Sequence, residues 1–187
     1  MPQDDELGEA AILLAVTNEP DDPKIILTKR AEHLASHAGE VAFPGGKWER
    51  GDADLLETAL RETQEEIDLS PDQVDVIASM PASQTRHSMR VRPYVGLVSS
   101  ESVLTANPDE LDAVFHVPLR YFLDQTNLTV ERFVGPDYSL RMPCYVYQGY
   151  RIWGFSLVVL VEFLNLTLDA DIQLRYPDKI SLRPEVD

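Results

Sequence analysis

Two runs rich in β-branched and aliphatic residues open the chain, at residues 10–17 and 24–28. A turn-forming segment of Asn, Asp and Pro, residues 18–23, separates them. Runs of this composition around such a segment are typical of strands, so we predict that paired strands begin the domain.

The pattern changes to a helical period after residue 54. Apolar side chains then recur on one helix face, at Leu56, Ala59, Leu60, Thr63 and Ile67. Asp54, followed three residues later by Glu57, forms the capping box of a helix start. Ser70-Pro71-Asp72 stops the helix, which is predicted to end near Asp68.

The rest of the chain alternates strand and helix signals. Strands are predicted at residues 74–80, 90–99, 130–134 and 142–147, with a polar loop at 81–89 and a turn at Gln148-Gly149. Residues 107–110 are read as a turn that opens a short helical element, followed by a helix through Phe122 and a core helix at 155–164. The alternating apolar tail after Leu164 predicts an edge strand, packed either on its own domain or between subunits. The pattern predicts an α/β fold, an α/β/α sandwich with a mixed sheet.

Length and charge narrow the class of protein. A chain of 187 residues fits one domain, residues 1–187, in which 165–187 form a C-terminal arm. A formal net charge of -16 argues against nucleic acid or an anionic membrane as a partner. The acidic amino terminus, the lack of a long apolar run and the lone Cys144, read as a buried thiol, predict a cytoplasmic protein.

Three glutamates, Glu62, Glu65 and Glu66, share the other face of the predicted helix. Like charges at this spacing destabilise a helix by a few tenths of a kcal/mol each. Oxygen-ligated cations such as Mg²⁺ offset that repulsion, so the cluster predicts a metal-binding face. The alternative is a solvated acidic surface.

The spacing around these glutamates resembles the signature of the Nudix hydrolases, G-x5-E-x7-R-E-U-x-E-E-x-G-U, where U is a bulky apolar residue. The run from Arg61 to Glu66 fits its second half. Three departures occur: Asp52 stands at the first acidic position, one extra residue precedes Arg61, and Asp68 replaces a glycine. The resemblance implies the α/β/α sandwich fold and hydrolysis of diphosphate linkages with Mg²⁺ or Mn²⁺ on Glu62, Glu65 and Glu66.

A second tract, from Ile26 to Gly46, resembles the additional motif of the coenzyme A pyrophosphatases in that family, L-L-T-x-R-[SA]-x3-R-x3-G-x3-F-P-G-G. Arg30 fits its first arginine and is assigned to substrate binding, while Ala35 replaces the second. Looser similarity extends through most of the chain. A homodimer is plausible from the same resemblance.

Roles follow for individual residues. Arg61 is expected to orient one of the glutamates through a fork-shaped ion pair, the alternative being a helical surface pair. The general base stays open between Glu65 and a loop carboxylate, Asp109 or Glu110. The catalytic set is therefore Glu65, Glu62 and Arg61.

A cationic group in this acidic chain, Arg86, His87, Arg90 and Arg92, is a candidate to bind the 3′-phosphate of coenzyme A. Its alternative is pairing with surface carboxylates. His33 and His37 are read as loop or substrate contacts rather than zinc ligands, and His116 as a packed core residue.

Three functions remain open. The favoured one is cleavage of coenzyme A or its derivatives to adenosine 3′,5′-bisphosphate and 4′-phosphopantetheine. The second is the same chemistry on another nucleoside diphosphate derivative, such as ADP-ribose or a dinucleotide, which the replacement at Ala35 favours. The third is a ligand-binding regulator without turnover, against which the three glutamates argue.

Overall fold

The computed structural model describes residues 8–85, 88–134 and 139–176. Its contacts group the chain into two compact units, residues 1–119 and 120–187. A single domain over the whole chain stays a prediction.

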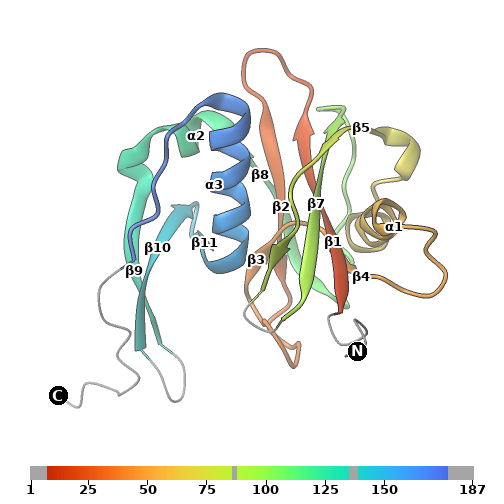
Figure 1. Ribbon diagram of the computed structural model, residues 1–187, viewed down its shortest axis with the longest axis horizontal. Helices are drawn as coiled ribbons and strands as arrows, with labels where there is room; N and C mark the ends of the chain where they lie inside the picture. Colours follow the sequence, from red (N-terminus) through yellow and green to blue (C-terminus); the bar gives the residue numbers. More distant parts are fainter. Residues whose placement is uncertain (1–7, 86–87, 135–138, 177–187) are drawn as a thin grey trace, which may run out of the picture. The chain divides into compact units, whose positions relative to one another are not determined.

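The first unit is built on a mixed sheet, seen in Figure 1 as the strands from red to green. Its strands are β1 (Glu9–Thr17), β2 (Lys24–Arg30), β3 (Val41–Ala42), β4 (Gly45–Lys47), β5 (Val74–Ser79), β6 (Ser83–Gln84), β7 (Arg90–Val98) and β8 (Leu111–Pro118). The main path runs β3-β2-β1-β7-β5, with β4 paired to β1, β6 to β7 and β8 to β2. β1 and β7 are parallel and the other pairs are antiparallel. The predicted α/β class and mixed sheet are confirmed.

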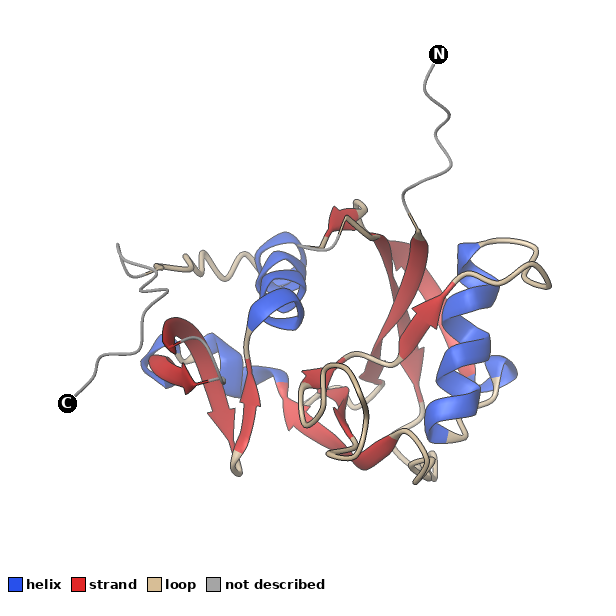
Figure 2. Ribbon diagram, turned by 90° about the horizontal axis from the view of Figure 1, so that it is seen from below, coloured by secondary structure: helices blue, strands red, loops and turns tan. Residues whose placement is uncertain are grey.

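Helix α1 (Leu55–Ile67) lies along β1 and β4, as Figures 1 and 2 show. The side chain of Asp54 accepts from the backbone N–H of Glu57, which confirms the predicted cap at Asp54. The Glu57 carboxylate accepts from the N–H of Ala53, one residue before the cap, so the return bond differs from that of a capping box. The helix ends at Asp68, which adopts the left-handed conformation (φ 59°) that the family motif gives to glycine.

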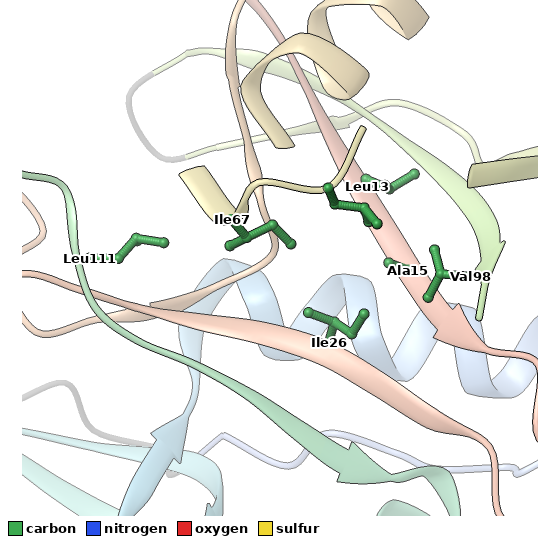
Figure 3. Close-up of a cluster of buried hydrophobic side chains, with 7 residues drawn as sticks. Leu13, Ala15, Ile26, Ile67, Val98 and Leu111 are labelled. Carbon is green, nitrogen blue, oxygen red and sulfur yellow. The ribbon is translucent and has the colours of Figure 1, made fainter. Parts of the chain in front are cut away.

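A cluster of buried aliphatic side chains fixes α1 on the sheet (Figure 3). It joins the end of α1 to strands on both sides of β1, through Leu13, Ala15, Ile26, Ile67, Leu69, Val98 and Leu111. Burying a side chain of this size contributes roughly 1.5–3 kcal/mol. The acidic face of α1 therefore has a fixed rotation relative to β1 and β4.

The short helical element predicted after residue 107 is wrong. Residues 108–110 form a turn and are followed by β8, which pairs with β2 from Lys24 opposite Pro118 to Arg30 opposite Leu111. Leu111, Phe115 and Val117 are buried at a two-residue period, so the apolar pattern was that of a strand. The turn residues before it also suit a helix start, which is why the sequence predicts a helix here.

The second unit contains α2 (Leu119–Leu123) from its second residue onward, the 3₁₀ turn Gln125–Asn127, and a sheet in the order β11-β10-β9. The strands β9 (Leu128–Val134) and β10 (Ser139–Tyr147) confirm the predicted ones, and the turn at Gln148 and Gly149 leads into β11 (Tyr150–Ile152). Helix α3 (Gly154–Leu168) includes the predicted core helix. Cys144 is buried and unoxidised, as predicted.

The edge strand predicted after Leu164 is wrong. Leu166 and Leu168 belong to the last turn of α3, and residues 169–176 form no strand. Asp169 and Asp171 adopt left-handed conformations that interrupt an extended chain. Instead, the side-chain amide of Asn165 pairs with both backbone groups of Ile172 and holds the arm against α3.

No helix within the described residues is long and apolar enough to cross a bilayer.

Candidate active site

The glycine pair at the start of β4 allows α1 to approach the sheet. A Cβ on Gly46 would lie 2.4–2.6 Å from the three carboxylate atoms of Glu62. Gly45 has φ +146°, and a Cβ there would lie 2.3 Å from the carbonyl oxygen of Ala11 in β1. Any other residue at these positions would push the glutamates away from the strand, or the strand away from β1.

Glu66 is the most buried of the three glutamates, with 4% of its surface exposed. Its Oε2 accepts from the backbone N–H of Gly45 at 3.0 Å. Burial is the main reason that the pKa of its carboxyl is raised to about 8. The hydrogen bond from Gly45 lowers this pKa, whereas the negative charges of Glu110 and Glu62 raise it further. A cation beside Glu66 would stabilise its ionised carboxylate and so offset the cost of burying that charge.

Glu62 lies beside Gly46 with its side chain 16% exposed, and burial raises its pKa. Arg61, the next contributor, opposes that shift. Glu65 differs, because its side chain is 54% exposed and its contact is a long one with Arg61, at 3.4–3.5 Å. Two of the three predicted glutamates are thus brought together against β4, and the third borders solvent.

The predicted fork between Arg61 and a glutamate is corrected. Nε and Nη2 of Arg61 donate to the two carboxylate oxygens of Asp52 at 2.8 and 3.0 Å, so the partner in the fork-shaped ion pair is Asp52. The remaining nitrogen, Nη1, donates to Glu62 at 3.1 Å. Arg61 therefore connects Asp52, in the loop before α1, to the glutamate face.

Asp52 is the functional residue that sequence reasoning left without a role. It also accepts from the Thr58 hydroxyl at 2.8 Å and the Glu49 backbone N–H at 3.0 Å. These donors, and Arg61 above all, hold the pKa of its carboxyl well below the usual range. The available signal was its place at the first acidic position of the family motif.

We expect Asp52→Asn to lower kcat/KM about 10- to 100-fold, because partners that orient ligating side chains have effects of this size. The amide keeps one acceptor but loses the charge and one prong of the fork. Steady-state kinetics at saturating Mg²⁺ measure the effect, with Asp72→Asn, an exposed aspartate of the same unit, as control. Unchanged kinetics in a folded Asp52→Asn variant would show that Arg61 needs no such anchor.

The end of β2 and the turn before β8 place further charges near Glu66. The guanidinium of Arg30 lowers the pKa of Glu66, and its buried Nε has no hydrogen-bond partner within the described part of the chain. Glu110 acts in the opposite direction on Glu62 and Glu66. Of the two loop carboxylates predicted as general base, Glu110 is therefore the one whose charge raises the pKa of both Glu62 and Glu66.

Backbone hydrogen bonds tie the loop before β8 to the end of α1 and to the residue after β2. The N–H groups of Thr105 and Asn107 donate to the carbonyls of Ile67 and Glu66 at 3.0 and 2.8 Å. The Ala31 N–H donates to the Glu110 carbonyl at 2.9 Å. His33 Nε2 lies 3.1 Å from the Asp109 carbonyl, which can only accept, so this nitrogen carries the proton.

Other predicted residues lie elsewhere. Arg86 and His87 fall outside the described residues. Arg90 is exposed at the start of β7, where its guanidinium lies 3.9 Å from the Glu9 carboxylate. Ala35 is exposed in the loop, His37 contacts Glu40 at 2.9 Å, and His116 is half-buried.

The carboxylates of α1 suit a hard divalent cation. Within the described residues, no three acidic, His or Cys side chains already converge as a complete ligand set. Glu62 and Glu66 nevertheless offer carboxylate oxygens held against the Gly45-Gly46 turn, which are the ligands Mg²⁺ takes together with water and substrate oxygens. The residues fit such an ion, with Glu65 as the side chain that would have to turn inward.

Comparisons with known proteins agree with this geometry. A model of the NUDIX domain matches residues 7–133. Nudix hydrolase 15, mitochondrial, of Arabidopsis thaliana is 37% identical over 167 residues, covering 86% of this chain but only 59% of that protein. The uncharacterized Nudix hydrolase NudL of Salmonella paratyphi B is 37% identical over 154 residues, covering 82% of this chain and 80% of that one.

The fold has a similar counterpart among solved structures. The crystal structure of a Nudix hydrolase from M. smegmatis, RenU, matches with a TM-score of 0.59 at 14% identity, covering 89% of each chain. At that identity the likeness concerns the fold alone. With the domain model over more than half of its length and relatives at 37% identity, the chain belongs to the Nudix hydrolase family.

Proposed function

We propose that this protein hydrolyses the diphosphate linkage of coenzyme A or its derivatives, giving adenosine 3′,5′-bisphosphate and 4′-phosphopantetheine. The observation that carries the proposal is the set formed by the buried Glu66, the half-buried Glu62 and the buried Nε of Arg30, which has no hydrogen-bond partner among the described residues. A cation held by carboxylates, together with a guanidinium that has a donor to offer, is complementary to the negative charge of a diphosphate. The resemblance of residues 26–46 to the coenzyme A motif supplies the substrate.

Family members use divalent cations, and Mg²⁺ or Mn²⁺ is the proposed cofactor. When bound, such an ion neutralises charge on the diphosphate oxygens and makes a coordinated water more acidic. Glu62, Glu66 and Glu65 would hold it. Arg30 binds a phosphate oxygen. Arg61 keeps Glu62 in place, because it donates to the Glu62 carboxylate while it is itself anchored by Asp52.

The base that takes the proton from water is proposed to be Glu65 or Glu110. Glu65 is exposed and weakly held, so water reaches its carboxylate. Glu110 acts electrostatically on Glu62 and Glu66 from the loop that is tied to α1. Separate Glu65→Gln and Glu110→Gln variants distinguish them, since loss of the base lowers kcat more than KM.

Purified protein with Mg²⁺ or Mn²⁺ is expected to release both named products from coenzyme A in equal amounts. Chromatography of the products is the measurement, and Arg30→Gln should raise KM by weakening the phosphate contact. Release of dephospho-coenzyme A, or of a free thiol compound alone, would contradict the proposal. ADP-ribose, NADH and diadenosine compounds belong in the same assay.

Rapid ADP-ribose hydrolysis without coenzyme A cleavage would favour the second substrate class, to which the exposed Ala35 in place of the motif arginine points. Binding of these compounds without turnover would favour the regulator. A cytoplasmic location and a homodimer remain predictions of the same proposal.

A further inference from the structure

Three exposed side chains of different chemistry form one row across the beginning of β1. The register of β4 and β1 pairs Lys47 with Ala10, and the backbone N–H of Trp48 donates to the Glu9 carbonyl at 2.9 Å, so Trp48 lies opposite Glu9. On the other side of β1, Glu9 pairs with Arg90 of β7. Side chains of directly paired residues lie on the same face of a sheet.

That face is the one on which α1 lies. Side chains two residues apart on a strand point the same way, and the Cβ direction of Gly46 leads to the Glu62 carboxylate. Trp48 is two residues from Gly46, about 7 Å along the strand at the usual rise. The row therefore borders the glutamate face of α1. A nucleoside could span the distance between Trp48 and a diphosphate bound at Glu62.

Trp48 is a large aromatic residue held in place without being buried. Its backbone N–H is bonded to Glu9, and its indole Nε1 donates to the Asp52 carbonyl at 3.2 Å, yet 45% of its surface stays exposed. A fixed and exposed indole is a surface on which an aromatic base can stack without an ordering cost.

Arg90 supplies an available cation in the same row. Its side chain is 55% exposed and its nearest Glu9 oxygen is 3.9 Å away, a separation at which surface ion pairs contribute little. Adjacent strands are about 4.8 Å apart, so Trp48 and Arg90 are separated by roughly 10 Å across Glu9. An aromatic ring, a carboxylate and a guanidinium thus follow one another over the length of a nucleotide.

We propose that Trp48, Glu9 and Arg90 form a subsite for an adenosine 3′-phosphate group. The base stacks on Trp48, the Glu9 carboxylate accepts a hydrogen bond from the free ribose hydroxyl, and Arg90 binds the phosphate in place of Glu9. The Glu9 carboxylate also repels that phosphate, which limits affinity and favours a ligand that carries the ribose hydroxyl. This subsite rests on the proposed function, because it holds the half of coenzyme A beyond the diphosphate.

Tryptophan fluorescence tests the subsite without metal or turnover. The chain has 2 tryptophans, so Trp153→Phe leaves Trp48 as the reporter. Titration with adenosine 3′,5′-bisphosphate is expected to quench its emission in a saturable way, and 4′-phosphopantetheine is expected to leave it unchanged. Absence of quenching, or equal effects of both compounds, would overturn the subsite.

Variants separate the two contacts. By calorimetry, Trp48→Leu should weaken adenosine 3′,5′-bisphosphate binding roughly 5- to 150-fold, the range of base stacking, while Trp48→Phe retains most of it. Arg90→Gln should weaken the bisphosphate about tenfold and leave adenosine 5′-phosphate unchanged. Tyr176→Leu, an aromatic residue with 49% exposure in the other unit, is the matched control.

The outcomes distinguish the subsite from the function. Coenzyme A cleavage that is indifferent to Trp48→Leu and Arg90→Gln overturns the subsite and leaves the enzyme proposal standing. Quenching by the bisphosphate in a protein that does not cleave coenzyme A supports the subsite and overturns the proposed substrate.

Discussion

Replacing Glu66 by Gln is expected to lower kcat by about three orders of magnitude or more while it makes the metal-free protein more stable. The amide keeps the acceptor for the Gly45 N–H and nearly the same volume, but it removes the charge offered to a cation. Loss of a ligand to the cation that stabilises the transition state lowers kcat more than it changes KM. Kinetics at saturating Mg²⁺ and at saturating Mn²⁺ provide the measurement.

The stability effect has a defined pH dependence. The folded pKa of Glu66 is raised from 4.5 to about 8, so its contribution to stability is complete below pH 4.5 and is lost as the pH rises through about 8. Gln does not ionise and escapes that loss. At pH 8 without divalent cations, we expect the variant to have a free energy of unfolding roughly 2 kcal/mol higher than the wild type.

Urea unfolding at pH 4.5, 6 and 8 measures this difference, and the exposed Glu101→Gln controls for the change in net charge. Added Mg²⁺ should stabilise the wild type and leave Glu66→Gln unchanged, because a ligand stabilises only the folded state that binds it. A variant that keeps full activity, or one that responds to Mg²⁺ like the wild type, would remove Glu66 from the metal-binding face.

Replacing the two neighbouring glycines, Gly45 and Gly46, by alanine is expected to have different effects, on stability in one case and on activity in the other. Gly46→Ala brings a methyl group against the end of the Glu62 side chain, which can swing away, so we expect a folded protein with kcat/KM lowered about 100-fold. Gly45→Ala meets backbone atoms of Ala11 and Ile12 at 2.3 and 2.6 Å, in a conformation with φ +146°. It should lower the free energy of unfolding by about 3 kcal/mol or more.

Gly51→Ala is the matched control, because its Cβ would meet nothing within 4 Å. Thermal unfolding and kinetics of all three variants separate displacement of a side chain from displacement of the strand. If Gly46→Ala and Gly45→Ala lose stability equally, Glu62 is not free to move, and the close contact at Gly46 is structural.

Local signals explain what the sequence could predict. The cap at Asp54, the end at Asp68 and the glutamate spacing on α1 depend on residues within a few positions of one another. β8 was missed because its character depends on pairing with β2, more than 80 residues away at Lys29 and Ala113, while its turn residues suit a helix start equally well. The fork from Arg61 to Asp52 was missed because its geometry depends on how the preceding loop folds back on the helix.

The amides that tie the loop to α1 have a consequence for how the site meets its substrate. The last carbonyls of a helix need partners from outside it, and here Glu66 and Ile67 receive them from Asn107 and Thr105. The segment leading to Glu110 thus serves as the end cap of the helix that bears Glu66, and swinging it outward would fray that helix. A substrate bound at the proposed site would therefore meet a loop and a helix that are already assembled, and little of its binding energy would be spent on ordering them.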